Sequence, residues 1–208
     1  MNLETKYRML CERPSDIHEH LPTLCRYASE CDHVTEMGVR YVVSTFGLMM
    51  GRPRRLVSVD IVHPRDMTGG HNDCIKGKDE FALAEQCAVQ NNVDFEFVLA
   101  SSLEIDMENT ELLFLDTLHR YAQLRAELER HHHKVSKYMI LHDTETFAFR
   151  DEGQEQQDAS ENTVIPPKRG LWLAVNEFLA EHPEWIISER FVNNNGLTVL
   201  KRTNNKQS

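Results

Sequence analysis

The sequence predicts a doubly wound α/β domain with a seven-stranded sheet, a closing antiparallel hairpin and an N-terminal helical cap. Short apolar segments typical of buried strands alternate with segments whose apolar residues have helical spacing. Near the C-terminus, Asn193-Asn-Asn-Gly196 separates two further strand-like segments and is a hairpin signal. The 208 residues suffice for one such domain with its own core. We expect the cap at residues 1–31 and the α/β domain at residues 32–208.

Composition narrows the classes of function. The formal net charge of −10 argues against a large surface for a phosphate backbone, so we expect no nucleic-acid partner. No apolar run approaches the length of a membrane span, and the N-terminus lacks the pattern of a secretion signal. The cysteines are odd in number and scattered: Cys11, Cys25, Cys31, Cys74 and Cys87. We therefore expect reduced thiols in a soluble, cytoplasmic protein with a small-molecule or glycan partner.

The cap is predicted to be helical. Ser15 and Asp16 can cap a helix in which Ile17, Leu21, Leu24 and Tyr27 share one face. Pro22 lies inside that pattern and is expected to kink or restart the helix. Such a helix either packs on the edge of the sheet or covers a ligand site as a lid.

The first strand is expected to begin at Val34 and to turn at Gly38, which suits a backbone with positive φ. A helix over residues 40–50 follows and ends at Gly51-Arg-Pro53. The turn and the helix N-terminus together form a site for a polar ligand. The second strand, residues 54–61, carries Asp60 near its end, where an acid commonly accepts hydrogen bonds from ribose hydroxyls.

Alternating helices and strands continue along the chain. A helix over residues 78–91 leads to a third strand over 95–100, which Ser101 and Ser102 follow. The fourth strand, 111–116, is nearly all apolar and ends in Asp116, and the fifth ends in His142 and Asp143. Because parallel strands share one carboxyl edge, we expect Asp60, Asp116 and Asp143 to meet at one crevice.

The C-terminal third closes the sheet. Residues 150–162 are acidic and nearly free of apolar side chains, which predicts a mobile loop over residues 145–168. A helix over residues 170–179 precedes two strands, 185–191 and 197–201. A loop in this place could fold over an acceptor or remain a solvated insertion.

Several of these residues together resemble a known family. The set Glu36, Gly38, Ser44 and Asp60, with Phe114-Leu-Asp116, His119, Tyr121 and Leu141-His-Asp143, is similar to motifs of class I S-adenosylmethionine-dependent methyltransferases. The closer likeness is to the catechol O-methyltransferase-like and cephalosporin-hydroxylase-like branches, over residues 34–144. Val42 stands where those relatives carry a second glycine. The resemblance implies a Rossmann-like sheet and S-adenosyl-L-methionine as cofactor.

The resemblance also implies roles for the site residues. The residues expected to bind the cofactor are Glu36, Gly38, Ser44, Asp60, Ser101, Ser102 and Asp116. Relatives place a divalent metal at the ends of strands four and five, which implies Asp116, His142 and Asp143 as ligands of Mg²⁺ or Mn²⁺. Histidine suits Mn²⁺, Fe²⁺ or Zn²⁺ better than Mg²⁺, so the identity of the metal stays open.

Removal of a hydroxyl proton requires a base or a metal. His119 follows Asp116 by three residues and has an ordinary pKa that permits it to act as a base near neutral pH, with His142 as the second candidate. The catalytic residues are thus predicted to be His119, Asp116 and His142. The run His131-His-His133 is interpreted as a polar helix end, because adjacent helical residues point to different sides.

The closest branch of that family implies, as the function, transfer of a methyl group to a hydroxyl of a sugar, in a glycan or a glycosylated small molecule. A catechol-type acceptor is the alternative within the enzyme class. A non-catalytic nucleotide-binding module of a larger glycan-processing chain is favoured by Val42, and a metal-dependent oxygenase is a third alternative. A homo-oligomer is compatible with each of these functions.

Overall fold

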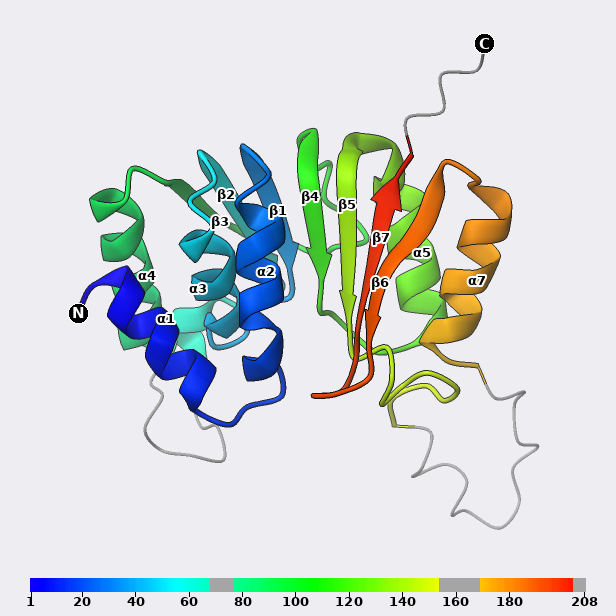
Figure 1. Cartoon of the computed structure of the whole chain (residues 1–208), viewed down its shortest axis with the longest axis horizontal. Coiled ribbons are helices and arrows are strands. Elements are labelled where there is room, and N and C mark those ends of the chain that lie inside the picture. Colours follow the sequence, from blue (N-terminus) through cyan, green and yellow to red (C-terminus); the bar gives the residue numbers. More distant parts are fainter. Residues whose placement is uncertain (68–76, 154–168, 204–208) are drawn as a thin grey trace.

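A computed structural model describes residues 1–67, 77–153 and 169–203 of the chain. Within them, a seven-stranded sheet has the strand order β3-β2-β1-β4-β5-β7-β6 (Figure 1). The strands are β1 (His33–Met37), β2 (Arg55–Asp60), β3 (Asp94–Leu99), β4 (Thr110–Leu115), β5 (Val135–His142), β6 (Trp185–Phe191) and β7 (Leu197–Arg202). All seven predicted strands are therefore present, with ends that differ by one or two residues.

The direction of the strands confirms the predicted fold class. The pairs β1–β2, β2–β3, β1–β4 and β4–β5 are parallel, whereas β7 is antiparallel to both β5 and β6. The chain thus builds β1, β2 and β3 outward on one side and then returns to place β4 on the other side of β1. Such a reversal opens a crevice beyond the carboxyl ends of β1 and β4, where ligands bind in folds of this type.

Helices cover both faces of the sheet (Figure 1). They are α1 (Leu3–Glu12), α2 (Leu21–Ala28), α3 (Val43–Met50), α4 (Gly77–Gln90), α5 (Tyr121–His131) and α7 (Leu171–Glu181), with short 3-10 helices η1 (His18–His20), η2 (Pro64–Asp66) and η3 (His132–Lys134). One buried apolar cluster joins α1 to α4 with one face of the sheet, and a second joins α5 and α7 with the other. Alternate residues of β4 supply the two clusters, Phe114 the first and Leu113 the second.

The N-terminal cap is helical, but its boundaries differ from the prediction. Asn2 caps α1 by accepting a hydrogen bond from the Thr5 amide, and α2 begins at Leu21 with Pro22 in its first turn. Pro22 lacks an amide hydrogen and is tolerated there, so the predicted restart is confirmed. The predicted helix cap at Ser15 and Asp16 is wrong, because these residues lie in the connection between α1 and η1.

The cap packs tightly on α3. A side chain on Gly47 would come within 2.9 Å of Leu21 Cδ2, and one on Gly51 within 2.6 Å of Ala28 Cβ. Leu21 and Ala28 are fully buried. The two glycines of α3 thus permit the close approach of α2, which makes the cap part of one apolar core.

The helix after β1 starts later than predicted, at Val43 rather than at residue 40. Arg40 and Val42 have φ of 46° and 66°, a left-handed conformation that L-residues adopt at a cost of about 1–2 kcal/mol. The Val42 side chain is completely buried, and this burial offsets part of that cost. Val42 therefore has a backbone conformation that glycine adopts more readily than valine.

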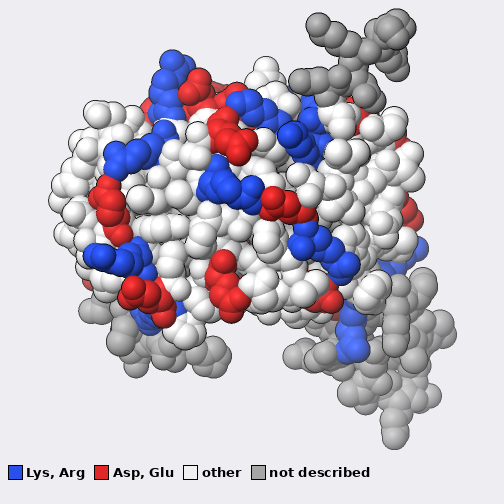
Figure 2. Space-filling view, in the orientation of Figure 1, with Lys and Arg blue, Asp and Glu red and all other residues white. Residues whose placement is uncertain are grey.

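The surface shown in Figure 2 carries mixed charge, with acidic side chains next to basic ones across the face. Ion pairs join helices to strands at the surface, for example Arg26–Glu189 at 2.5 Å. Among the described helices, none has the length and apolar character required to cross a membrane. Cys11, Cys25, Cys31 and Cys87 are free thiols.

The predicted mobile loop over residues 145–168 is described only up to residue 153, and residues 154–168 lie outside the described part of the chain. The first part makes defined contacts. The Thr146 hydroxyl donates to Asn195 Oδ1 at 3.0 Å, and the Glu152 amide donates to the His119 carbonyl at 2.9 Å. This segment therefore folds back over the carboxyl end of β5.

Candidate active site

A cavity of about 550 Å³ lies at the carboxyl edge of the parallel strands, at the reversal between β1 and β4. Its lining includes Asp60, Asp116 and Asp143, which lie after or at the ends of β2, β4 and β5. The structure thus confirms that the three acids meet at one crevice. The apolar side chains Ile61 and Val62 line one wall, although they are exposed to solvent.

The Gly38 turn forms one wall of the cavity. Gly38 has φ of +89°, as its predicted role requires, and its amide donates to the Val59 carbonyl at 2.9 Å. The carboxylate of Asp60 accepts hydrogen bonds from the amides of Val39 and Arg40 at 2.7 and 3.1 Å. A second oxygen of Asp60 accepts from the Val62 amide at 3.0 Å. Asp60 therefore fixes the path of the turn as well as lining the cavity.

Glu36 lies beneath this wall and is completely buried, outside the lining of the cavity. Its carboxylate accepts hydrogen bonds from the hydroxyls of Ser44, Thr45 and Ser58, the last two at 2.7 Å. Burial raises the pKa of Glu36 to about 7, against the opposing effect of the three hydroxyl donors. Glu36 thus joins β1, β2 and the first turn of α3, whereas Ser44 also lines the cavity.

Ser101 and Ser102 line the cavity after β3, which pairs with β2. The Ser102 hydroxyl donates to Glu127 Oε1 at 2.6 Å, and the Gln123 amide group donates to the same oxygen at 2.7 Å. The hydroxyl of Thr117 also donates to Glu127, at 2.7 Å. Burial raises the pKa of Glu127. This buried carboxylate fixes the two cavity residues Ser102 and Gln123, and its part was not predicted from sequence.

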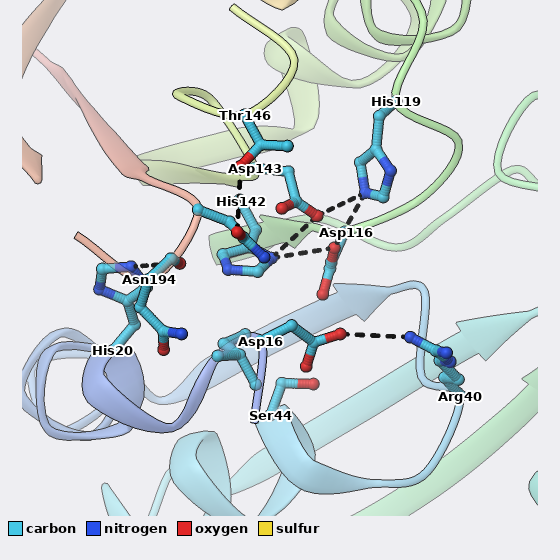
Figure 3. Close-up of polar contacts among 12 residues, drawn as sticks. Asp16, His20, Arg40, Ser44, Asp116, His119, His142, Asp143, Thr146 and Asn194 are labelled. Atoms are coloured by element: carbon cyan, nitrogen blue, oxygen red, sulfur yellow. Dashed lines mark hydrogen bonds and ion pairs between the residues drawn. The ribbon is translucent and has the colours of Figure 1, made fainter. Parts of the chain in front are cut away.

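Four side chains form a compact polar cluster at the ends of β4 and β5 (Figure 3). His119 Nε2 donates to Asp143 Oδ2 at 2.8 Å and lies 3.4 Å from Asp116 Oδ1. His142 Nδ1 lies 3.2 Å from Asp116 Oδ1 and 3.3 Å from Asp143 Oδ2. The predicted catalytic and metal-binding residues are therefore brought together, and Asp116, His119 and Asp143 also line the cavity.

The cluster shifts the pKa values of its members in opposite directions. Burial lowers the pKa of both His119 and His142, but the adjacent Asp116 and Asp143 carboxylates outweigh it and raise each to about 10. Burial would raise the pKa of Asp116, yet the two imidazoles hold it far below its ordinary value. Without a ligand, His119 is therefore an imidazolium that donates hydrogen bonds.

Further residues orient the cluster. His119 Nδ1 lies 3.1 Å from Glu152 Oε2, and the ring of Phe147 stacks on that of His119 with centroids 4.7 Å apart. Both partners come from the segment after β5. Their sequence gives no signal for this role, because the contacts join positions that are about thirty residues apart in the chain.

The cap contributes to the cavity from the other side (Figure 3). Asp16 and Ile17 line it, and Asp16 forms an ion pair with Arg40 at 3.2 Å. His20 Nε2 donates to the carbonyls of Asn193 and Asn194 at 3.0 and 3.1 Å, which ties the cap to the hairpin between β6 and β7.

Asp116, His142 and Asp143 can together hold a divalent metal ion, since one donor atom of each lies within 4.8 Å of the others. Two carboxylates with one imidazole suit Mn²⁺ or Fe²⁺ at least as well as Mg²⁺. The separations of 3.2 and 3.3 Å between His142 Nδ1 and the two carboxylate oxygens are compatible with ligands that share one ion. The residues present thus fit the metal that the resemblance implies.

Comparisons with known proteins show where this fold occurs. No family model matches the chain, and no curated protein matches it in sequence. Solved structures do match. An O-methyltransferase from Bacillus cereus in complex with S-adenosylhomocysteine has a TM-score of 0.52 and 13% identity, over 97% of this chain and 90% of that chain.

Two further structures hold the same ligand. Magnesium protoporphyrin IX methyltransferase from Synechocystis PCC 6803 has a TM-score of 0.56 and 11% identity, over 96% of this chain and 94% of that chain. A methyltransferase from Podospora anserina has a TM-score of 0.53 and 11% identity, over 97% and 87%. At such low identity the similarity establishes the fold alone. The chain therefore has the Rossmann-like fold of class I S-adenosylmethionine-dependent methyltransferases, as its motifs predict.

Proposed function

We propose that this protein is an S-adenosylmethionine-dependent O-methyltransferase that acts on a hydroxyl of a small molecule or glycan. The observation that carries the proposal is a single cavity with two chemically distinct ends. One end has the Gly38 turn, Asp60 and the serines after β3, and the other has Asp116, His119 and Asp143. A cofactor in the first end would place a transferable group beside the polar cluster.

The first end has the features that a nucleoside requires. Asp60 offers carboxylate oxygens to ribose hydroxyls, and Ser101 and Ser102 line the same cavity after the neighbouring strand. Ile61, Val62 and Leu118 supply apolar surface for a purine ring. The bound S-adenosylhomocysteine in structures of the same fold supports S-adenosyl-L-methionine as the cofactor. In this proposal Glu36 acts through Ser44 and Thr45 and does not touch the cofactor.

The second end has the features that a hydroxyl acceptor requires. Methyl transfer to oxygen is a displacement, so the protein must align the oxygen and remove its proton. We assign these tasks to Asp116, which orients the acceptor, and to His119, which takes the proton once it is neutral. A divalent cation on Asp116, His142 and Asp143 would neutralise the carboxylates that keep His119 protonated, and would polarise an acceptor oxygen.

The acceptor remains the sugar hydroxyl of the sequence-based prediction, with a catechol as the alternative. The acceptor end is polar, because Glu152 joins Asp116, His119 and Asp143 in the lining there, and this character favours a ligand with many hydroxyl groups. The non-catalytic alternative loses its main support, because Val42 has a left-handed backbone conformation, which is the one that a glycine at this position would adopt most easily.

The proposal is tested by calorimetric titration with S-adenosylmethionine and S-adenosylhomocysteine, with NAD as the control ligand. We expect micromolar dissociation constants for the first two and no binding of NAD. Transfer of a labelled methyl group to panels of sugars and catechols, with Mn²⁺, with Mg²⁺ and after chelation, then identifies the acceptor class. Absence of binding under all metal conditions would reject the methyltransferase. Binding with no transfer to any hydroxyl would favour the non-catalytic module.

A further inference from the structure

A second cluster of potential metal ligands lies outside the cavity, where the end of α5 meets the end of α7. Glu129 belongs to α5, His132 begins η3, and His182 caps the C-terminus of α7. One donor atom of each residue lies within 4.8 Å of the others. None of the three lines the cavity. They precede β5 and β6, and therefore lie toward the edge of the sheet opposite to the carboxyl end of β5.

The distance between two donors of the cluster matches that between ligands of a bound transition metal, and the third residue packs beside them. His182 Nε2 lies 3.1 Å from Glu129 Oε1, and the rings of His132 and His182 have centroids 4.1 Å apart. Zinc–ligand bonds of about 2.0–2.1 Å place neighbouring tetrahedral donors about 3.3 Å apart. Small side-chain rotations would thus bring the three donors around one ion.

His132 has an unsatisfied ring nitrogen. Its Nδ1 is buried and makes no hydrogen bond within the part of the chain that the structure describes. The nearest carboxylate oxygen to this atom, Oε1 of Glu184, lies 3.7 Å away, which is beyond hydrogen-bond distance. A buried polar nitrogen without a partner has a free-energy cost, and coordination of a metal would remove it.

Surrounding contacts hold the ligands in place. Phe178 is fully buried, and the centroid of its ring lies 4.5 Å from that of His182. The Trp185 amide donates to the His182 carbonyl at 3.0 Å, which fixes the turn between α7 and β6. Glu184 Oε1 lies 3.5 Å from His182 Nδ1, on the other side of the ring from Glu129. A carboxylate in this place orients a metal-binding histidine through its second nitrogen.

One cation already contacts the cluster. Arg125 Nη1 donates to Glu129 Oε1 at 2.6 Å, and Nη2 of the same side chain forms an ion pair with Glu181. The hydrogen bonds that join Glu129 to Arg125 and to His182 both involve Oε1. Arg125 can keep Glu181 as its partner when Glu129 turns toward a metal.

From these observations we propose that Glu129, His132 and His182 form a binding site for Zn²⁺ or a similar transition-metal ion. The site has two imidazoles and one carboxylate, with Glu184 orienting His182 and water completing the coordination. Imidazole ligands favour Zn²⁺ over Mg²⁺. The ion would link the segment between α5 and β5 to the segment between α7 and β6. This site is separate from the residues proposed for methyl transfer.

The run His131-His-His133 thus takes on a new meaning. As predicted from the sequence, the three histidines do not bind one metal ion together. His131 is buried and its Nε2 donates to the Ser102 carbonyl at 2.7 Å, and His133 is exposed. Only His132 faces His182, which lies fifty residues later in the sequence.

The test is zinc binding by the untagged chain, stripped of metal, in competition with a chromogenic chelator. The variants are His132→Gln and His182→Gln, with His133→Gln as the matched control on the exposed neighbour. We expect the wild type and His133→Gln to bind one equivalent of Zn²⁺ more than the other two variants. The thiols and the polar cluster of the cavity are present in all four proteins, so any zinc that they bind cancels in the comparison. Equal stoichiometry and affinity in all four would overturn the proposal.

Two further measurements cover the other outcomes. If a histidine variant fails to fold, Glu129→Gln changes an exposed side chain and is expected to weaken zinc binding at least tenfold; unchanged affinity would reject the site. Visible absorption of bound Co²⁺ should show the intense bands of four-coordination in the wild type and lose them in His182→Gln. Affinity for S-adenosylhomocysteine should be equal in all variants, which separates this proposal from the proposed function.

Discussion

The α-carbon of Gly38 packs directly on the main chain of Asp116. A Cβ on Gly38 would lie 1.9 Å from the Asp116 carbonyl oxygen and 3.2 Å from the Thr117 amide nitrogen. The Asp116 amide in turn donates to the Met37 carbonyl at 2.9 Å. The turn that forms one end of the cavity and the acid that forms the other are thus in backbone contact.

Gly38→Ala is therefore expected to lower the free energy of unfolding by about 3 kcal/mol, through steric overlap added to a left-handed φ. Gly153→Ala is the matched control, because Gly153 also has positive φ, at +81°, but its nearest neighbour is a side-chain nitrogen 3.5 Å away. That control should lose only about 1 kcal/mol. Urea denaturation measures both, and equal losses would show that the contact with Asp116 has no effect.

Asp60→Ala should weaken binding of S-adenosylhomocysteine at least tenfold. The change removes the acceptor of three amide hydrogen bonds that shape the Gly38 turn, together with the oxygens proposed to bind ribose. Asp94→Ala removes the same charge from β3, where Asp94 pairs with Arg55 on the surface, and should leave the affinity unchanged. Calorimetric titration measures these affinities. An Asp60→Ala protein that binds S-adenosylhomocysteine as tightly as the wild type would exclude Asp60 from the cofactor site.

Asp116→Asn and His119→Gln should lower kcat by about 10²–10⁴, the range found for loss of acid–base catalysis, and change cofactor affinity far less. Glu152→Gln, which contacts the outer nitrogen of His119, should have a smaller effect on kcat. Initial rates with the acceptor found in the panel give these values. A matching loss of cofactor affinity in the first two variants would assign the two residues to binding rather than to the reaction.

Glu36 gives the protein a specific dependence on pH. Its pKa in the folded state is raised to about 7, from an ordinary value of 4.5. Because the folded state binds this proton more tightly, Glu36 stabilises the fold fully at pH values below its pKa in the unfolded chain. This stabilisation is lost as the pH rises through its pKa in the folded protein. The contribution amounts to about 3 kcal/mol between pH 4.5 and 7.5.

Glu36→Gln cannot titrate and should lack this dependence. The difference in free energy of unfolding between the variant and the wild type should shift in favour of the variant by about 3 kcal/mol from pH 5 to pH 8. Other titrating groups are shared by both proteins and cancel in the difference. A difference that stays constant with pH would mean that Glu36 is ionised across the whole range.

The centre of the sheet could be predicted from sequence because β1, β2, β4 and β5 are largely buried. Residues 112–115 of β4, for example, form an apolar run with no polar interruption and end at an acid. The convergence of Asp60, Asp116 and Asp143 then follows from parallel topology alone. Strand type, strand order at the hairpin and the place of the crevice are all consequences of such local patterns.

Side-chain partners could not be predicted in the same way. The burial of Glu36 depends on hydroxyls 8, 9 and 22 residues away, and the local sequence gives no sign that they face one carboxylate. Glu127 and Glu152 were missed for the same reason. The boundary errors have a different cause, since tertiary packing forces Val42 into a conformation that its own preference opposes.

The close crossing of α2 over α3 has a consequence for how the chain comes apart. Helices α1 and α2 share a core with α3 and α4, and Lys6 forms an ion pair with Glu80 of α4 at 2.5 Å. The first 31 residues therefore pack as part of the core and not as a detachable lid. Their removal would expose the apolar surface of α3 around Gly47 and Gly51. We expect one cooperative melting transition for the whole chain, and aggregation of a protein that begins at residue 32.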